Sequence, residues 1–201
     1  MIVGLLIAVK QLRLAATGDE PRRRALTNIE KESELKPITF ACEETLGMVP
    51  EQIAQQILDI SRWSSFQGYA VLPGIKAAEF EIRTPEILGS RIRVTSTNGS
   101  RHVEEIAEWV PDRRVRLLMR QFSPPLSRLA TGFNETWEFS RIGQDTRVVR
   151  SFELHATSRV TRPLLWLISI LLKKAIARHL REMRESSDGE ETRAMAHGEI
   201  P

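Results

Sequence analysis

Apolar residues near the end of the chain recur at helical spacing. Within residues 163–184 they fall three or four positions apart: Leu165, Ile168, Leu172, Ile176, Leu180 and Met183. This spacing predicts one long amphipathic helix whose apolar side chains form a single stripe. Such a helix needs an apolar surface on which to bury the stripe.

The preceding residues alternate between apolar and polar positions over short segments, which is typical of strands. Pro50 and Glu51 are helix-start signals, and Ile53, Ile57 and Ile60 supply an apolar face after them. Trp63 and Phe66 follow in a second short turn. Strands are expected at 37–46, 75–83, 90–97, 100–110, 114–122, 132–140 and 146–156. The order predicts an α+β domain, with an antiparallel sheet packed on the long C-terminal helix.

The domain is expected to cover residues 37–184. Residues 1–36 read as an apolar N-terminal segment followed by a charged linker, and residues 185–201 as a polar C-terminal tail. The apolar stretch 1–9 would span about 14 Å as a helix, too short to cross a bilayer. No basic region precedes it and no cleavage signal follows, so a secretory signal peptide is not expected.

Composition narrows the functional classes. The chain is 41% hydrophobic and 27% charged, with a formal net charge of +3, and its basic residues do not form a nucleic-acid recognition pattern. The single cysteine, Cys42, excludes an internal disulfide, and no ligand spacing predicts a metal or other cofactor. Without a nucleophile elbow or phosphate-binding loop, nothing in the sequence demands an enzyme. A cytoplasmic protein is expected.

The last two predicted strands can be paired from their turn. If Ile142 and Asp145 flank the tip, the facing pairs are Phe139–Val148, Trp137–Arg150 and Glu135–Phe152. Glu135 and Arg150 then lie diagonally on an otherwise apolar face. Arg150 could bind a ligand carboxylate or phenolate. Alternatively, the two charges form a structural ion pair with Arg150 stacked on Trp137.

The preceding hairpin is harder to orient. With Val110 opposite Val115, one face carries His102, Glu104, Ile106, Glu108, Val115, Leu117, Met119 and Gln121. The other carries Val103, Glu105, Ala107, Trp109, Leu118 and Phe122, with Arg116 and Arg120. Neither face is cleanly apolar. If Glu104 is buried beside a ligand it could act as an acid or base; otherwise it is solvated or ion-paired. His102 and His179 are the other candidates for proton transfer, or simple packing residues.

Several segments together resemble a known superfamily. They are VPEQIAQQILDISRWSSF, GYAVLPGIKAAEFEI, NGSRHVEEIAEWVPDRRVRL and ETWEFSRIGQDTRVVRSFEL. This ordered set, within residues 37–184, resembles the polyketide cyclase/dehydrase branch of the START-like (SRPBCC) superfamily. The resemblance implies a helix-grip fold, in which a curved antiparallel sheet wraps around the long C-terminal helix and leaves a cavity. It also implies an acid at the Glu104 position, which turns that face inward. It does not imply one chemistry, because members differ.

These patterns predict a protein that binds a small hydrophobic or amphipathic molecule, lipid-like or polyketide-like. The expected ligand-binding residues are Phe40, Glu104, Met119, Trp137, Arg150, Leu165, Ile168, Leu172 and Ile176. The alternative is a cyclase or dehydratase in which Glu104 or Arg150, as catalytic residues, would polarise or orient a substrate in the same cavity. A third interpretation has side chains filling the cavity and no ligand.

The first half of the C-terminal helix is apolar on its outer side too. Trp166, Leu167 and Ile170 point away from the main stripe. Large open apolar areas are rare on soluble monomers, so a cover is expected. The N-terminal segment 2–9 or a second copy, forming a homodimer, would provide it. Peripheral membrane contact near Lys173 and Lys174 is the other expectation.

Overall fold

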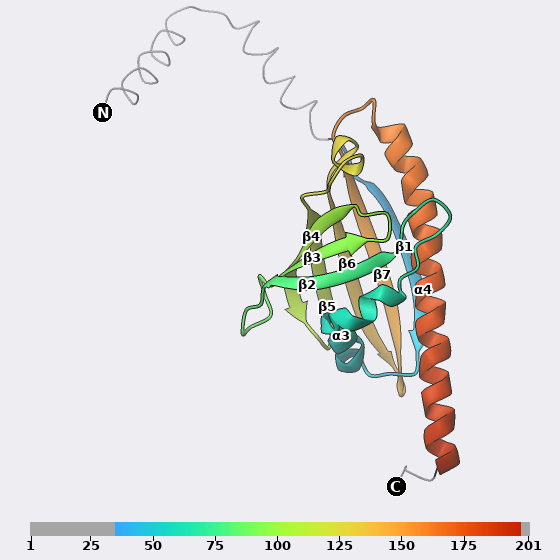
Figure 1. Ribbon diagram of the computed structural model, residues 1–201. Helices are drawn as coiled ribbons and strands as arrows, with labels where there is room; N and C mark the ends of the chain where they lie inside the picture. The colour runs from blue at the N-terminus through green and yellow to red at the C-terminus, as the bar shows by residue number, and fades with distance from the viewer. Residues whose placement is uncertain (1–34, 198–201) are drawn as a thin grey trace, which may run out of the picture. The chain divides into compact units, whose positions relative to one another are not determined.

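The computed structural model describes residues 35–197, with side chains described as far as residue 187. Its strands are β1 (Ile38–Leu46), β2 (Ile75–Ile82), β3 (Arg91–Ser96), β4 (Arg101–Val110), β5 (Arg114–Arg120), β6 (Ala130–Ile142) and β7 (Asp145–Ala156). Its helices are α3 (Pro50–Leu58), the 3-10 helices η1 (Ile60–Ser65) and η2 (Leu126–Arg128), and α4 (Arg162–His197) (Figure 1). The segment predicted at residues 1–9 lies outside the described residues.

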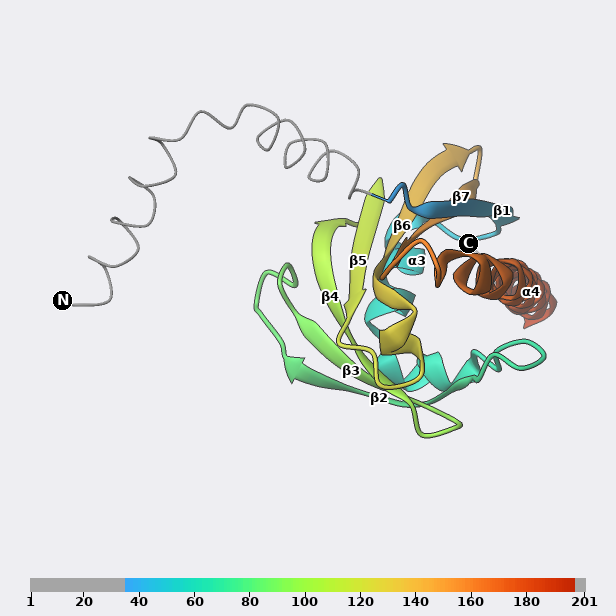
Figure 2. The ribbon, with the colours of Figure 1, turned by 90° about the horizontal axis from the view of Figure 1, so that it is seen from above.

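All seven strands belong to one antiparallel sheet. Their order is β1-β7-β6-β5-β4-β3-β2, so β1 and β2 form the two edges. Seen from above, the sheet curves from β1 round to β2, and α3 and α4 lie on its concave side (Figure 2). The predicted α+β helix-grip architecture is confirmed.

Helix α3 begins where the sequence predicts. Pro50 occupies the first turn together with Glu51, and the side chains of Ile53 and Ile57 are buried. The Trp63 indole Nε1 donates a hydrogen bond to the Ile57 backbone oxygen at 3.0 Å, which joins η1 to the end of α3. Ile60, expected on the face of this helix, instead begins η1.

Helix α4 buries the predicted stripe. Leu165, Ile176 and Leu180 are buried in the core, and Leu172 and Met183 pack against it while partly exposed. Fully burying a side chain of this size stabilises the fold by about 1.5–3 kcal/mol. The helix packs on β1 and β7. It also continues to His197, so the predicted tail from residue 185 begins as helix. After Pro163 in its first turn, the helix contains no further proline.

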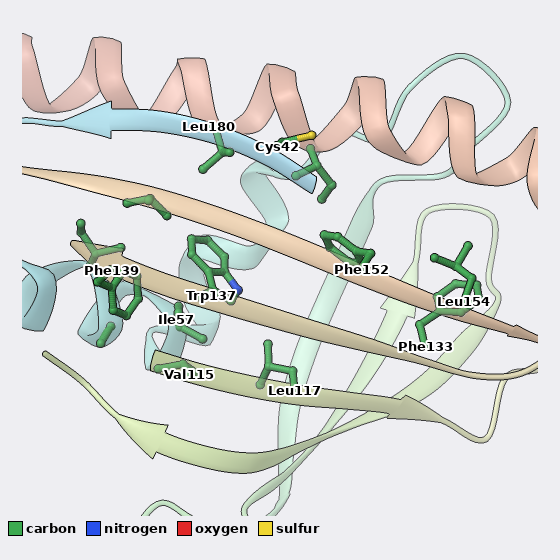
Figure 3. Packing of buried hydrophobic residues seen from close by; sticks show 14 of the residues in the cluster. Cys42, Ile57, Val115, Leu117, Phe133, Trp137, Phe139, Phe152, Leu154 and Leu180 are labelled. Carbon is green, nitrogen blue, oxygen red and sulfur yellow. The ribbon is translucent and has the colours of Figure 1, made fainter. Parts of the chain in front are cut away.

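The core between sheet and helices is made by side chains from several elements. Val115 of β5, Trp137 of β6 and Leu180 of α4 all belong to the buried cluster (Figure 3). Phe152 on β7 is also almost completely buried. Close packing of this kind fixes the rotamers of the side chains beside it.

The two predicted hairpin registers had different outcomes. In β6–β7, Trp137 faces Arg150 and Ile142 faces Asp145, so this pairing is confirmed. In β4–β5, Val110 faces Arg114 instead of Val115, so that register is wrong. Only three residues, 111–113, connect the paired positions, where the prediction had four, and a bulge between Ile106 and Glu108 shifts the pairing by one further residue.

Between the bulge and the turn, the predicted inner and outer faces of β4 are wrong. Trp109 pairs with Val115 and packs against the core. Glu108, expected on the inner face, forms an ion pair with Arg114. On the other side of the bulge, Glu104 and Ile106 are buried as expected.

Among residues 35–197, no helix is both long and apolar enough to cross a membrane.

Candidate ligand-binding cavity

A cavity of about 860 Å³ lies between the concave face of the sheet and α4. Sheet residues such as Leu117, Phe133 and Phe152 line one side, and Ile168 and Leu172 of α4 line another. The segments containing η1 and η2 add the remaining apolar wall. Its volume falls in the range of pockets that hold small organic molecules.

Most of the predicted ligand-binding residues line this cavity: Glu104, Met119, Trp137, Arg150, Ile168, Leu172 and Ile176. Phe40 does not, because its ring stacks on Phe152 with the ring centroids 5.0 Å apart. Leu165 does not either, because it is completely buried in the core. The structure therefore places these side chains together, and their contact with a ligand stays a prediction.

Glu135 and Arg150 form a buried ion pair in the cavity wall. Arg150 Nε donates to Glu135 Oε1 at 2.8 Å, and Nη2 donates to the same oxygen. The guanidinium carbon lies 3.9 Å from the centroid of the Trp137 ring. Burial raises the pKa of the Glu135 carboxyl, against the opposing pull of Arg150, and the nearby charge of Glu104 raises it further. The structural interpretation of this pair is thus observed directly.

His179 of α4 completes the surroundings of Arg150. Arg150 Nη1 and His179 Nδ1 are 3.0 Å apart, and because arginine only donates, Nδ1 must accept. The imidazole proton therefore sits on Nε2. Burial, followed by the charges of Arg150 and Arg178, lowers the pKa of His179 to about 3. His179 is consequently a neutral donor at the cavity surface.

Glu104 lies on the same wall, on β4. It is 5% exposed, and its Oε1 is 2.9 Å from His102 Nε2. Both residues line the cavity. The face containing Glu104 looks inward, as the family resemblance implied. A carboxylate paired with an imidazole can accept and return a proton.

The segment between η1 and β2 contacts α4 across the cavity. Arg178 Nη2 donates to the Gly68 backbone oxygen at 3.0 Å. Lys174 Nζ lies 5.8 Å from the Tyr69 ring centroid, and Phe66 meets the His179 ring edge-on. Gly68 has φ +69°, and a Cβ added there would come within 2.2 Å of the Leu72 oxygen. This segment therefore holds one specific conformation against the helix.

Several lining residues were not predicted from the sequence. Phe66 and Leu126 come from irregular or short 3-10 segments, where no period assigns a direction to side chains. Phe122 was placed on the outer face, yet it follows Gln121, whose φ of +57° ends the strand and turns Phe122 toward the cavity. The sequence signal that could have identified these lining residues was the presence of apolar residues within otherwise polar connections.

Other candidate chemistry finds no support among the described residues. Burial raises the pKa of the Cys42 thiol, whose Sγ is 3.5 Å from the Lys173 backbone oxygen, so it packs as a neutral group. No three His, Cys, Asp or Glu side chains within residues 35–187 gather in an arrangement that could hold a metal ion.

The outer side of α4 exposes apolar surface, as predicted. Trp166 is 56% exposed, and Leu164 and Leu167 are about half exposed. Lys173 and Lys174 are exposed two turns further along the helix. What covers this surface stays a prediction.

No protein-family model matches the sequence, and no curated protein matches it. Solved structures do match its fold. A protein from Thermus thermophilus superposes with a TM-score of 0.57 at 19% identity, covering 76% of this chain and 99% of its own. The Zhui aromatase/cyclase from Streptomyces sp. R1128 gives a TM-score of 0.58 at 8% identity, covering 75% and 93%.

A START superfamily protein from Mycobacterium smegmatis gives a TM-score of 0.53 at 12% identity, covering 72% of this chain and 98% of its own. At these identities the likeness concerns the fold. The chain therefore has the helix-grip fold, which it shares with a START superfamily protein and an aromatase/cyclase.

Proposed function

We propose that this protein binds a small hydrophobic or amphipathic molecule, lipid-like or polyketide-like, between the sheet and α4. The observation that carries the proposal is the cavity of about 860 Å³, whose mostly apolar wall contains a few buried polar groups. This combination is typical of small-ligand sites, because the apolar wall supplies affinity and the polar groups fix orientation.

A neutral dye tests the proposal. N-phenyl-1-naphthylamine should fluoresce strongly with the native protein, and Leu172→Trp should weaken binding about tenfold by filling part of the cavity, equivalent to about 1.4 kcal/mol. Leu167→Trp is the matched control, because Leu167 lies on the exposed side of the same helix. An absence of dye binding, or equal binding by both variants, would contradict the proposal.

A second candidate is an enzyme of the cyclase or dehydratase type. The buried Glu104–His102 pair favours it, because this pair could remove a proton from a carbon next to a carbonyl and return it to a departing hydroxyl, releasing water. Incubation with a β-hydroxy ketone, followed by mass spectrometry, would show loss of water. That loss should disappear in Glu104→Gln, and an unreactive wild-type protein would count against the enzyme.

A further inference from the structure

The one buried guanidinium in the described part of the cavity wall is already neutralised. Each of the three nitrogens of Arg150 donates to a protein acceptor, two to Glu135 and one to His179. Its planar surface is covered by Trp137. A ligand carboxylate could reach only the remaining N–H groups of Nη1 and Nη2, and it would compete with Glu135 for the same cation.

Glu104, unlike Arg150, has a polar atom without a partner among the described residues. Its Oε1 contacts His102, whereas its Oε2 accepts no hydrogen bond from any described residue. The side chain is nine-tenths buried and lines the cavity. This oxygen is not among the fully enclosed atoms without a partner, so it is open to the cavity and can accept a hydrogen bond from a group held there.

The charges around the cavity also disfavour an anionic ligand group. Glu104 and Glu135 contribute two carboxylates to the buried wall, against the single guanidinium of Arg150. His179 stays neutral, because its Nδ1 accepts from Arg150. His102 can offset at most one charge when protonated. The exposed Arg62 and Arg101 lie where the cavity meets solvent. An anionic group moved inward would approach two carboxylates.

We infer that the polar group of the ligand inside the cavity is a hydrogen-bond donor, a hydroxyl or an amine, which donates to Glu104 Oε2, and that carboxylates are selected against. This rests on the proposed function and names its ligand class. His179, whose Nε2 carries the imidazole proton, lines the same cavity, so the wall contains a donor as well as this acceptor.

A matched set of ten-carbon molecules tests this inference. 1-Decanol, decylamine and decanoate are compared as competitors of N-phenyl-1-naphthylamine at neutral pH, where decanoate is ionised. We expect decanol and decylamine to displace the dye at concentrations about tenfold or more below decanoate. Equal displacement, or a preference for decanoate, would overturn the inference while leaving cavity binding intact. Failure of the dye itself to bind would instead overturn the proposed function.

Two variants test the role of Glu104. Glu104→Gln should reduce the preference to about twofold or less, because the amide can donate to decanoate. Glu105→Gln is the matched control: it removes the same charge from the next residue, which points to the opposite face of β4 and does not line the cavity. Circular dichroism confirms that both variants fold. A preference for decanol that survives in Glu104→Gln would show that Glu104 does not select the ligand.

Discussion

The buried Glu135–Arg150 pair allows a direct test of the energetics of this cavity wall. The changes are Glu135→Gln, Arg150→Met and the two combined. Glu135→Gln leaves the Arg150 cation buried with a weaker acceptor. Arg150→Met leaves Glu135 without its cation, and burial then favours the protonated carboxyl even more strongly. Each single variant therefore leaves one member of the pair unsatisfied.

The size of the effect follows from the contacts. Each single change should lower the free energy of unfolding by about 3–5 kcal/mol, the range for breaking a buried ion pair. Arg150→Met also removes the hydrogen bond to His179 and the stacking on Trp137, so it should fall at the upper end. The double variant removes both charges, and its loss should be at least about 2 kcal/mol smaller than the sum of the single losses.

Urea unfolding monitored by circular dichroism measures these differences. The exposed Glu51–Arg141 pair is the control, because both side chains are about half exposed. Its single variants should each change stability by less than about 1 kcal/mol. Strictly additive losses for Glu135 and Arg150, within about 0.5 kcal/mol, would refute the argument that the two buried charges depend on each other.

Two further predictions concern α4. Because the pKa of His179 is lowered from 6.5 to about 3, the unfolded chain binds a proton more readily between these values, so stability should fall as the pH falls through this window. In His179→Asn the free energy of unfolding, measured with urea at a series of pH values, should decline less as the pH falls. The same dependence on pH in the variant and the wild-type protein would contradict this prediction. We also expect copies of the protein to associate through the exposed face of α4, so Trp166→Ser with Leu167→Ser should reduce the mass measured by sedimentation. A wild-type monomer would exclude this association, and loss of binding to anionic vesicles in the variant would indicate a membrane instead.

The β6–β7 hairpin shows what the sequence pattern can predict. The β6–β7 register was correct because only Gly143 and Gln144 separate the facing residues Ile142 and Asp145, and Gly143 takes φ +65°. A two-residue turn with a glycine at positive φ leaves little freedom in pairing. The diagonal placement of Glu135 and Arg150 then follows from the pleat.

The predicted β4–β5 pairing fails first at the turn, where three residues instead of four separate the facing positions Val110 and Arg114, and then at a bulge. The bulge after Ile106 moves Trp109 to the core face and Glu108 away from it, and strict alternation cannot represent an inserted residue. The cavity wall contributed by irregular segments was missed because side-chain direction there depends on individual backbone angles. His179 was a candidate for proton transfer, or a packing residue, from its residue type alone, whereas its lowered pKa depends on its burial and on the charge of Arg150.

The arrangement of α4 has a kinetic consequence. Along one side the helix packs on β1 and β7, and on the other it meets the segment 66–74 through the contacts of Arg178, Lys174 and His179. These latter contacts can separate while every hydrogen bond of the sheet stays formed. We therefore expect the release of a molecule bound in the cavity to depend on local opening of this segment, at a free-energy cost far smaller than that of global unfolding.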